Sequence, residues 1–460
     1  MTLDDVAVGQ ARTAQGIAQI IARIERLPFT WFHLKARVLV GTATFFDAFD
    51  ALAIAYVLPV LIPQWRLTPT DIGALISVGY VGQALGAIFF GWLAERRGRM
   101  LALTLTIAIY GVFSLLAALA WDYTSLFIIR TIQGIGLGGE VPIAATYINE
   151  ISRARERGRF VLLYECVFPL GLFCAALLGV WIVPTLGWHW MFIIGALPAL
   201  LVLPLRWLLP ESPRWLAQRG QFTQADHIVT GLETEVRKKG VELPPPNLAL
   251  TVMEHATRWQ ELFQGIYLQR TLVVWLLWFC AYFATYGIVT WLPSIYTSVF
   301  RLPLNQALQY SLVTQAFGLL GTLICALTID RTGRRPAFTL AFLLGSASLT
   351  VLWLVGANSP VEVVVLATLA NVFIYMISLG LYLYTPEIYP TRMRALGSSI
   401  GSVWLRVASA IGPMVMGVIV ANYPLSTAFL LFGAVLLLGG IMVGLFGIET
   451  KGAVLEEISP

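Results

Sequence analysis

Six ionisable side chains of this sequence stand within long apolar runs. An ionisable group at the centre of a membrane-spanning helix costs about 2.5–3.5 kcal/mol or more, so each one needs a function or a partner. Carboxyls in such runs can carry protons, and arginines can bind a carboxylate through two parallel hydrogen bonds. The six are Asp47, Asp50, Arg130, Glu140, Glu165 and Arg406.

Asp50 and Arg130 are predicted to lie at similar depths in a bilayer. At ~1.5 Å per residue, Asp50 lies about 18 Å from the inner end of its run. Arg130 lies about 9 Å from the outer end of its run, or about 21 Å from the inner face of a ~30 Å core. The two can therefore pair across helices. Asp47 shares a broad helix face with Asp50 but lies nearer the inner face. Three roles for Asp47 stay open: a proton relay, a substrate gate, and a capped structural acid that faces water.

Arg406 bears most directly on the identity of a bound solute. It lies about 17 Å from the inner face, close to the midplane, where solute-carrying membrane proteins bind their substrates. Its planar fork matches a carboxylate, so we interpret it as the ligand for a substrate carboxylate, with an internal partner of Asp47 or Asp50 as the alternative. For Glu140 we expect a structural bond to arginines of the inner loops, with substrate contact as the alternative. For Glu165, cavity and structural roles stay equally open.

Aromatic residues accompany these charges. A flat aromatic acid clamped between rings and held by Arg406 fits this inventory, and a packed helix interface fits it almost as well. Gln315 offers an amide contact. The candidate rings are Phe46, Phe49, Tyr164, Tyr282, Tyr286, Tyr375, Tyr382 and Trp404.

The composition places these residues in a membrane. Of the 460 residues, 58% are hydrophobic and 12% are charged, whereas a soluble globular chain carries about 25% charged residues. A surface so poor in charge has to face lipid. The four cysteines lie in apolar runs without a CxxC pair, and the four histidines are scattered, so we expect buried thiols and no metal site.

Twelve apolar runs are long enough to cross a bilayer core of ~30 Å, which takes about 20 residues per helix. They predict an all-α membrane protein of twelve transmembrane helices in two pseudosymmetric bundles (38–209 and 271–447). A cytoplasmic linker (210–270) joins the bundles, and terminal segments (1–37 and 448–460) flank them. The runs are 38–61, 72–93, 101–120, 124–149, 160–183, 188–209, 271–292, 306–329, 337–356, 361–386, 396–420 and 424–447.

Basic residues predict the orientation of these helices. Of the 30 Lys and Arg residues, only Arg66 and Arg301 fall in outer loops and two lie within helices, so both termini are placed in the cytoplasm. The basic residues of the linker suit anionic lipid or solvent rather than nucleic acid. The N-terminal segment shows no secretory leader. Its apolar periodicity around Ile20 and Ile24 predicts an amphipathic helix on the membrane surface.

Two motifs recur in the second half of the chain at nearly one offset. Between runs two and three, Gly91-x-x-x-Glu95-Arg96-x-Gly98-Arg99 has its counterpart between runs eight and nine in Ala326-x-x-x-Asp330-Arg331-x-Gly333-Arg334. After run four, Glu150-Ile151-x-x-x-Arg155-x-Arg157 has its counterpart after run ten in Glu387-Ile388-x-x-x-Arg392-x-Arg394. Such a match predicts a duplicated six-helix unit.

These motifs resemble those of the major facilitator superfamily over essentially the whole chain, with Glu95 where Asp is usual and Ala326 where Gly is usual. Arg130-x-x-Gln133-Gly134-x-Gly136 resembles a second motif of that superfamily. Pro210-Glu211-Ser212-Pro213-Arg214 and Glu449-Thr450-Lys451-Gly452 are similar to its sugar-porter and organic-ion branch. Three further stretches resemble bacterial niacin transporters, aromatic-acid:proton symporters and animal organic-ion and synaptic-vesicle relatives. They are Phe46-Asp47-Ala48-Phe49-Asp50, Gly138-Gly139-Glu140-Val141-Pro142 and Pro386-Glu387-Ile388-Tyr389-Pro390-Thr391.

The resemblance implies alternating access by two rocking bundles, and no enzymatic activity. In proton-coupled sugar porters, an acid at the position of Asp50 pairs with the arginine of the helix 4 motif, and its protonation couples proton entry to substrate movement. A fixed structural pair is the alternative. The repeated motifs are expected to form ion pairs that gate the cytoplasmic seam, although basic residues there would also set the topology. These gating residues are Glu95, Arg96, Arg99, Glu150, Asp330, Arg331, Arg334, Glu387, Arg392 and Arg394.

The function expected from these observations is proton-coupled uptake of a small organic anion, an aromatic monocarboxylate such as nicotinate. Coupling would use Asp50, Arg130 and Asp47, and the proton gradient would take the place of a cofactor. An uncoupled facilitator, a carrier of organic cations or sugar-like solutes, and a non-transporting receptor with the same fold are the alternatives. We expect a multi-pass monomer in the cell (plasma or inner) membrane, whose partners are the substrate, protons and lipid, and not nucleic acid.

Overall fold

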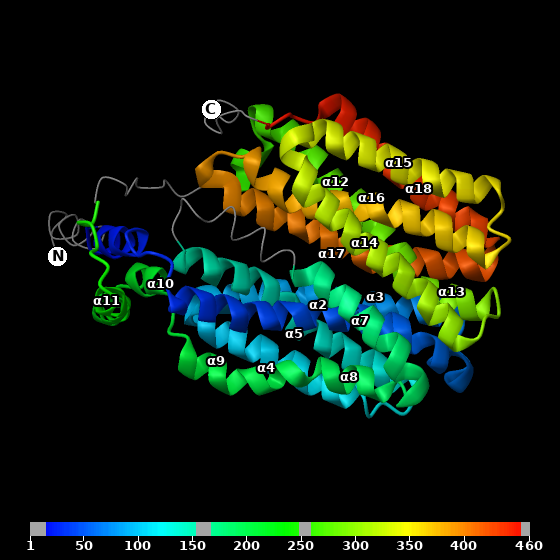
Figure 1. Cartoon of the computed structure of the whole chain (residues 1–460), viewed down its shortest axis with the longest axis horizontal. Coiled ribbons are helices and arrows are strands. Elements are labelled where there is room, and N and C mark those ends of the chain that lie inside the picture. The colour runs from blue at the N-terminus through cyan, green and yellow to red at the C-terminus, as the bar shows by residue number, and fades with distance from the viewer. Residues whose placement is uncertain (1–14, 153–166, 248–258, 452–460) are drawn as a thin grey trace.

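Two helical bundles lie side by side in the structure, a computed structural model that describes residues 15–152, 167–247 and 259–451 (Figure 1). The N-terminal bundle, in blue to green, occupies the lower half of the view, and the C-terminal bundle, in yellow-green to red with α12 (Gly265–Val289) in green, the upper half. Within these ranges the chain is almost entirely helical and contains no strand. The expected all-α fold in two bundles is therefore confirmed.

The N-terminal bundle contains five long helices and a broken sixth crossing. Gly195 ends the first piece of that crossing, and Pro198, which has no N–H to donate, lies in its 3-10 segment. The sixth apolar run therefore forms three short pieces rather than one helix. The bundle consists of α2 (Trp31–Trp65), α3 (Pro69–Arg97), α4 (Arg99–Ala117), α5 (Tyr123–Ile151), α7 (Val167–Thr185), and then α8 (His189–Gly195), η2 (Leu197–Leu201) and α9 (Val202–Leu208).

The C-terminal bundle contains six crossings, the first of which is interrupted between Val289 and Leu292. Across the described chain, eleven helical segments are long and apolar enough to span a membrane, and the shorter apolar segment His189–Leu201 belongs to the broken sixth crossing. This agrees with the twelve crossings predicted. The C-terminal bundle consists of η4 (Trp259–Phe263), α12 (Gly265–Val289), α13 (Leu292–Ser298), α14 (Leu304–Thr332), α15 (Arg334–Leu354), α16 (Pro360–Glu387), α17 (Thr391–Asn422) and α18 (Leu425–Phe446).

The first helix is longer than its apolar run. It begins at Trp31 because Thr30 caps it: the Thr30 backbone N–H donates to His33 Nδ1 over 3.2 Å. The His33 ring also lies 3.1 Å from the Ile151 carbonyl oxygen through Nε2. A helix of 35 residues is about 52 Å long at ~1.5 Å per residue, so α2 extends beyond a bilayer core.

The end of the bundles that carries α10 (Pro213–Gln218) and α11 (Phe222–Lys238) is here called the linker end, and the opposite end the far end (Figure 1). Toward the far end the two bundles share one apolar core, which includes Leu61 of α2, Leu75 of α3 and Tyr296 of α13. Toward the linker end the N-terminal bundle has a separate core, which includes Phe32 and Leu103. The bundles are therefore joined most closely at the far end.

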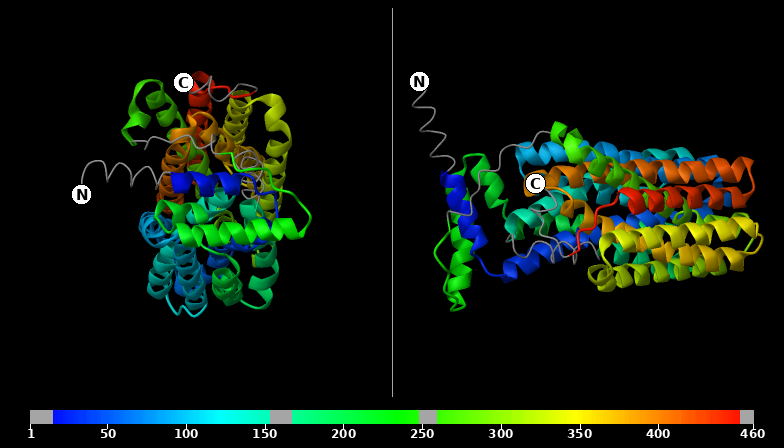
Figure 2. Two further views of the ribbon diagram at one scale, coloured as in Figure 1. Left: turned by 90° about the vertical axis from the view of Figure 1, so that its left-hand side faces the viewer. Right: turned by 90° about the horizontal axis from the view of Figure 1, so that it is seen from above.

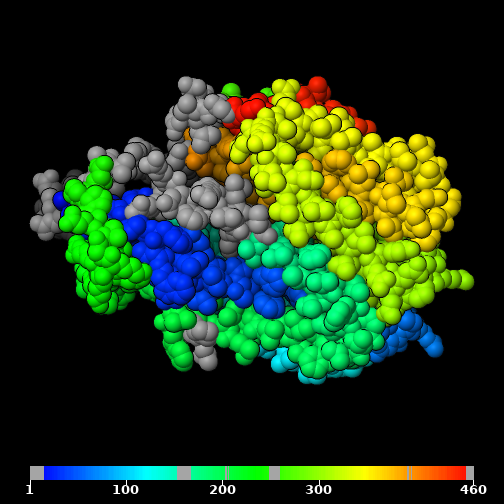
Figure 3. All heavy atoms as spheres, viewed as in Figure 1, coloured from blue at the N-terminus to red at the C-terminus, as the bar shows by residue number. Residues whose placement is uncertain are grey.

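Close packing at the far end depends on two glycines. A Cβ on Gly73 of α3 would lie 2.9 Å from the carbonyl oxygen of Pro413 in α17, and a Cβ on Gly417 would lie 2.6 Å from the carbonyl oxygen of Pro69. α13 also packs against α2. Toward this end, at the right of Figure 3, the atoms of the two bundles adjoin. Only residues without a side chain allow α3 and α17 to approach this closely.

A small helical subdomain lies at the linker end. It combines the N-terminal helix (15–25), α10 (Pro213–Gln218) and α11 (Phe222–Lys238), which lie across the end of the bundles (Figure 2). Ile20 and Ile24 are buried in one apolar cluster with Trp215 and Val229. The helix predicted around Ile20 and Ile24 is therefore present. Its expected position on the membrane surface is wrong, because α10 and α11 cover its apolar face.

Candidate functional site

Asp50 of α2 and Arg130 of α5 form a buried ion pair within the N-terminal bundle. Arg130 Nη1 donates to Asp50 Oδ2 over 2.7 Å, and the Asp50 side chain has no exposed area. Gln133 completes the network: its Nε2 donates to Asp50 Oδ1 over 2.8 Å, and its Oε1 accepts from Arg130 Nη1 over 2.9 Å. Because Arg130 and Gln133 are three residues apart, they present both groups on one face of α5.

Small residues make room for this network. A Cβ on Gly79 of α3 would lie 3.3 Å from Arg130 Nη2, and a Cβ on Gly195 would lie 3.3 Å from Asp50 Oδ1. Ser114 of α4 adds a contact of 3.4 Å from its Oγ to Asp50 Oδ1. The break after α8 therefore lies beside the Asp50 carboxylate. Helices α2, α3, α4, α5 and α8 all contribute to its surroundings.

Two further carboxyls are buried nearby. Glu140 of α5 is wholly buried; its Oε1 accepts from Thr44 Oγ1 over 3.0 Å, and its Oε2 has no hydrogen-bond partner among the described residues. Asp47 interacts electrostatically with Asp50, Arg406 and Glu140. The expected bond of Glu140 to arginines of the inner loops is wrong, because α5 carries this side chain into the bundle, where α2 supplies its partner. The described part of the chain contains no group of three or more His, Cys, Asp or Glu that could bind a metal ion.

Arg406 connects the two bundles halfway along their length. From α17 of the C-terminal bundle, its Nη2 donates to the Gly138 carbonyl oxygen of α5 over 3.2 Å, and its Nη1 donates to Ser402 O over 3.4 Å. The residue is 9% exposed. Its Nε has no hydrogen-bond partner, and within the described ranges no carboxylate forms an ion pair with it. Among the described residues, Tyr382, Asp47 and Tyr286 act on it electrostatically through space.

Tyrosines from both bundles surround Arg406 and Asp47. The rings of Tyr80 and Tyr286 meet across the bundle interface with centroids 4.8 Å apart. Tyr286 and Tyr382 interact electrostatically with Arg406. Tyr286 also stacks on Tyr282, at 6.1 Å between centroids. These four tyrosines therefore share one neighbourhood with the arginine.

The other predicted aromatic residues are placed more variously. Tyr375 donates to Gln315 Oε1 over 2.7 Å, so these two contact one another within the C-terminal bundle. Trp404 packs against Trp275, with 5.6 Å between the ring centroids. The ring centroids of Phe46 and Phe49 lie 6.1 Å apart, and Phe49 is wholly buried in the core. Tyr164 and Glu165 lie outside the described residues.

Gln133 and Tyr80 belong to the site, although the sequence did not identify them as site residues. Gln133 stands in the motif that begins with Arg130, and its spacing of three residues could have identified it as a partner of the same carboxylate. Tyr80 carries a polar tip in a run bordered by Gly79 and Gly82, which is the same kind of signal as the tyrosines that were included. Its hydroxyl is buried, and no group in the described part of the chain forms a hydrogen bond with it.

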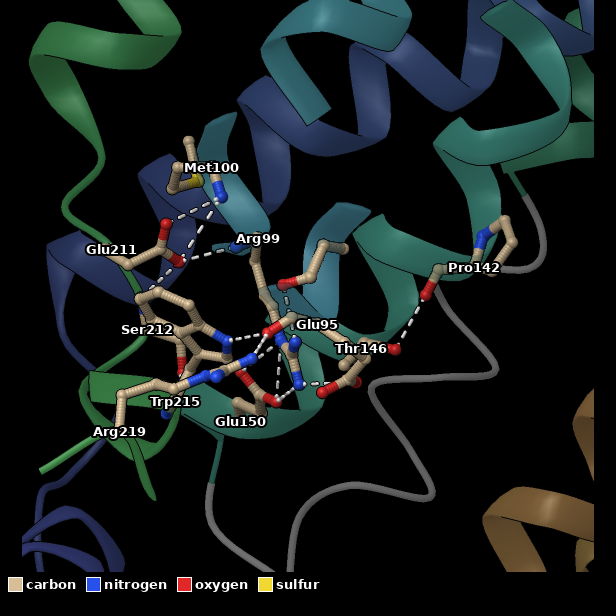
Figure 4. A network of polar contacts seen from close by, with 11 residues as sticks. Glu95, Arg99, Met100, Pro142, Thr146, Glu150, Glu211, Ser212, Trp215 and Arg219 are labelled. Atoms are coloured by element: carbon tan, nitrogen blue, oxygen red, sulfur yellow. Dashed lines mark hydrogen bonds and ion pairs between the residues drawn. The ribbon is translucent and has the colours of Figure 1, made fainter. Parts of the chain in front are cut away.

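The first copy of the loop motif forms its ion pairs within the N-terminal bundle (Figure 4). Arg99 Nη2 lies 2.9 Å from Glu150 Oε1 and 3.0 Å from Glu95 Oε1. Glu211 accepts from the backbone N–H groups of Arg99 over 2.9 Å and of Met100 over 3.1 Å. The linker thus caps the start of α4 with a carboxylate. Arg96 instead lies over the ring of Trp92, at 4.6 Å.

The second copy repeats this arrangement in the C-terminal bundle. Arg334 Nη2 lies 2.9 Å from Glu387 Oε1, and Arg334 Nη1 lies 2.8 Å from Asp330 Oδ1. Glu449 accepts from the backbone N–H groups of Arg334 over 3.0 Å and of Arg335 over 3.1 Å. Gly98 and Gly333 have φ angles of 106° and 90°, and each lies against the capping carboxylate of its own bundle. A side chain at either glycine would be strained by the positive φ angle and would also clash with the capping carboxylate.

The gating residues therefore pair within a bundle wherever the structure gives their partners. Arg99 and Arg334 each contact acids of their own half, so neither makes the contact across the cytoplasmic seam that the motifs predict for the outward-open state. Arg331 is exposed and Arg394 is half-buried. The side chain of Arg392 lies outside the described part of the structure. The bundles are joined at the far end instead, as the shared core shows.

Comparisons with known proteins agree with this architecture. The family model "Sugar (and other) transporter" matches residues 38–460. The chain is 35% identical over 445 residues to the niacin transporter NiaP of Acinetobacter baylyi. The alignment covers 95% of this chain and 99% of that protein. It is 29% identical to the synaptic vesicle 2-related protein of Xenopus laevis, over 95% of this chain and 82% of that protein.

Solved structures show the same fold. The crystal structure of a D-xylose–proton symporter superimposes with a TM-score of 0.69 at 20% identity, over 92% of this chain and 100% of that one. A partially occluded inward-open conformation of the xylose transporter XylE from E. coli gives a TM-score of 0.69, over 91% and 100% of the two chains. At this identity the likeness concerns the fold alone. Together with the family model and the niacin transporter, it establishes that this chain is a membrane-embedded transporter, not an enzyme, and belongs to the sugar (and other) transporter family of the major facilitator superfamily.

Proposed function

We propose that this protein takes up a small organic anion by proton symport, and that the anion is an aromatic monocarboxylate such as nicotinate. The observation that carries the proposal is the difference between the two buried arginines. Arg130 is paired with Asp50 at 2.7 Å, whereas Arg406 forms no ion pair with a described carboxylate and donates only to the backbone carbonyl oxygens of Gly138 and Ser402. A buried guanidinium in this condition is suited to receive the carboxylate of a substrate.

The contacts of Arg406 favour this role over an internal ion pair. Of its two candidate internal partners, Asp50 is occupied by Arg130 and Gln133. Asp47 acts on Arg406 only through space. The hydrogen bonds that Arg406 does make go to backbone carbonyl oxygens, which a charged carboxylate can replace because charge-assisted hydrogen bonds are the stronger ones.

Two features support an aromatic acid as the substrate. Tyr286 and Tyr382 lie near Arg406, and their rings can stack on a flat ring whose carboxylate binds the guanidinium. The 35% identity to a niacin transporter over nearly the full length of both chains points the same way. Nicotinate is therefore the first substrate to test.

Proton coupling would act through the Asp50–Arg130 pair. A proton on Asp50 removes the charge that holds Arg130, and a buried guanidinium cannot lose its own charge. The freed Arg130 then needs a new partner. The change in packing between α2 and α5 that follows would favour one arrangement of the two bundles over the other. Asp47, on the next turn of α2, is the candidate relay. The proton gradient supplies the energy, so no cofactor is required.

Alternating access would expose the site to each side in turn. By its basic loops, the linker end is assigned to the cytoplasm, so that both termini lie inside. Because the bundles are joined at the far end, this conformation corresponds to the state that exchanges substrate with the cytoplasm. The opposite state would open the Gly73–Pro413 contact and bring the motif residues of the two halves together at the cytoplasmic seam.

A carrier of organic cations is the second candidate. Asp47 and Glu140 are two buried acids, and besides the paired Arg130 only Arg406 among the described buried arginines near them could offset their charge. An organic cation could therefore replace the proton on one of these acids. This candidate predicts that Arg406 is an internal counter-charge and that cations, not nicotinate, are accumulated.

Uptake into proteoliposomes separates these candidates. We expect labelled nicotinate to accumulate when an inward proton gradient is imposed, and to equilibrate without accumulation when the gradient is collapsed. Nicotinate uptake that is the same with and without the proton gradient would identify an uncoupled facilitator. Accumulation of a labelled organic cation in place of nicotinate would identify the second candidate.

A further inference from the structure

Glu140 is a buried carboxyl that the proposed coupling by Asp50 and Arg130 leaves without a role. It has no exposed area. Within the described chain it has one hydrogen-bond partner, Thr44, whose hydroxyl lies 3.0 Å from Oε1, while Oε2 has none. A buried carboxylate oxygen without a donor is costly, whereas a carboxylic acid can carry its proton on that oxygen.

The groups around Glu140 provide little positive charge. From α2 it faces Thr44 and, through space, the acid Asp47. From α4, Tyr110 interacts with it electrostatically. The nearest arginine along its own helix, Arg130, is engaged by Asp50. From α17, Arg406 contacts the Gly138 carbonyl oxygen, two residues from Glu140, and forms no ion pair with the Glu140 side chain.

The balance of charge changes when an anion binds. With Asp50 and Arg130 paired, Arg406 is the one described cation that can offset Asp47 and Glu140. A substrate carboxylate on Arg406 would use that charge and leave both acids uncompensated in a dry site. Isolated buried carboxylates take up protons rather than remain charged. Anion binding at Arg406 should therefore bring a proton to this pair of acids.

We propose that Glu140 is a second proton-carrying carboxyl of the transport cycle, which binds a proton on Oε2 when a substrate carboxylate binds Arg406 and releases it at the linker end. This inference rests on the proposed proton symport and adds a proton site to it. Along α2, the partner residues Thr44, Asp47 and Asp50 follow one another from the linker end toward the far end. Glu140 lies at the level of Thr44 and is therefore the acid nearest the linker end. A proton that enters from the far end would reach Glu140 last, before it leaves at the linker end.

The position of Glu140 also explains how its proton could respond to the substrate. Gly138 and Glu140 belong to the same turn of α5, and Gly138 receives the hydrogen bond of Arg406. When Arg406 turns to a substrate carboxylate, this bond is released. The backbone next to Glu140 then loses its cationic contact at the same moment as the site gains a negative charge.

Calorimetry of nicotinate binding tests the inference. The purified full-length protein is titrated with nicotinate in two buffers of equal pH but different ionisation enthalpy, which gives the number of protons taken up per nicotinate bound. The variants are Glu140→Gln, which keeps the Thr44 contact but cannot titrate, and Glu140→Asp, which can titrate. Glu235→Gln, at a surface acid of α11 whose ion pair in the described chain is with Lys239, is the matched control.

We expect the wild type, Glu140→Asp and the Glu235→Gln control to take up protons on binding, and Glu140→Gln to bind nicotinate with proton uptake lowered by about one proton per site. Equal proton uptake by Glu140→Gln and the wild type would overturn the role of Glu140 and leave proton symport intact. Absence of nicotinate binding or of proton uptake in the wild type would overturn the proposed function itself.

A measurement on the wild type guards against a variant that does not fold. Dicyclohexylcarbodiimide modifies protonated carboxyls in apolar surroundings, and mass spectrometry identifies the modified residue. We expect modification of Glu140 that increases when nicotinate is bound and decreases as the pH is raised. Modification of Glu140 that nicotinate leaves unchanged, or no modification at any pH, would overturn the proposal.

Discussion

Arg406 of α17 donates a hydrogen bond to the carbonyl oxygen of Gly138 in α5, over 3.2 Å, and so joins the two bundles at their middle. The bond connects the arginine proposed to hold the substrate with the helix that carries Arg130, Gln133 and Glu140. A ligand that binds Arg406 would thereby act on both bundles at once. This relationship is the basis for the first prediction.

Arg406→Ala should weaken nicotinate binding strongly. Hydrogen bonds to a charged group contribute about 1.5–3 kcal/mol, so we expect the dissociation constant to rise about 10- to 100-fold or more, as each ~1.4 kcal/mol corresponds to a factor of ten. Arg406→Lys should retain part of the affinity, because it keeps the charge but loses the bidentate geometry. Calorimetry measures both. Arg237→Ala, on the exposed face of α11, is the control, and equal affinity of Arg406→Ala and Arg237→Ala would exclude the carboxylate role.

Asp50→Asn should abolish accumulation driven by the proton gradient. The substitution removes the titrating group and leaves Arg130 buried without its ion pair, at a cost of about 3–5 kcal/mol in stability. We expect a lower melting temperature in detergent and nicotinate uptake that no longer responds to the gradient in proteoliposomes.

The double variant Asp50→Asn, Arg130→Gln distinguishes coupling from a merely structural pair. Replacing both charges removes the unpaired arginine, so stability should recover in part. If the pair only holds α2 against α5, gradient-driven accumulation should recover along with stability. If Asp50 carries the proton, accumulation should stay lost.

Gly73→Val should prevent the bundles from closing at the far end. A Cβ at this position would lie 2.9 Å from the Pro413 carbonyl oxygen, and backbone atoms cannot move aside easily. We expect uptake to be lost while the protein remains folded. Ser294 of α13 is 1% exposed, so a Ser294→Cys reporter in a background free of native cysteines should react with a membrane-impermeant thiol reagent only during openings of the far end. It should therefore react faster when Gly73→Val is present.

Gly41→Val is the matched control for this experiment, because no atom lies within 4 Å of a Cβ at Gly41. It should leave both uptake and the reactivity of the reporter close to those of the unsubstituted protein. Normal uptake by Gly73→Val would contradict the role assigned to the far-end contact between α3 and α17.

Glu233→Gln should detach the N-terminal helix from α11. Burial disfavours the Glu233 carboxylate, but hydrogen bonds from Arg23 over 2.9 Å and Arg26 over 2.6 Å outweigh it and hold its pKa below the usual range. A carboxyl whose pKa is lowered by folding stabilises the folded state above its unfolded pKa of about 4.3. That stabilisation is lost as the pH falls through the lower, folded value.

Spin labels at Gln19→Cys and Lys238→Cys, in a background free of native cysteines, can report this contact. We expect a single short distance at neutral pH, a broad distribution in strongly acidic buffer, and the same broad distribution at neutral pH in Glu233→Gln. Glu235→Gln on the same helix should keep the short distance. A short distance that persists in Glu233→Gln would show that the remaining contacts, the apolar ones of Ile20 and Ile24 and those of Arg23 with Asp226 and Thr230, suffice without Glu233.

The sequence by itself determined the membrane class, the twelve crossings, the duplication and the family. These follow from local properties: the length of each apolar run, the side on which basic residues gather, and the spacing of motifs such as Glu95–Arg99 and Asp330–Arg334. Depth along a helix is also a local property, since each residue adds a constant rise. Asp50 and Arg130 were therefore expected at one level, and the structure places them in contact.

Only the tertiary structure decided how helices are rotated and which helices meet. Rotation decides that Glu140 faces Thr44 rather than the loop arginines, and that Gln133 and Tyr80 join the site. Packing decides that the N-terminal helix covers α10 and α11 rather than the membrane. It also decides that Arg99 and Arg334 pair within their own bundles. A single sequence carries no record of these contacts, because the partners are far apart along the chain and are selected by the shape of the whole core.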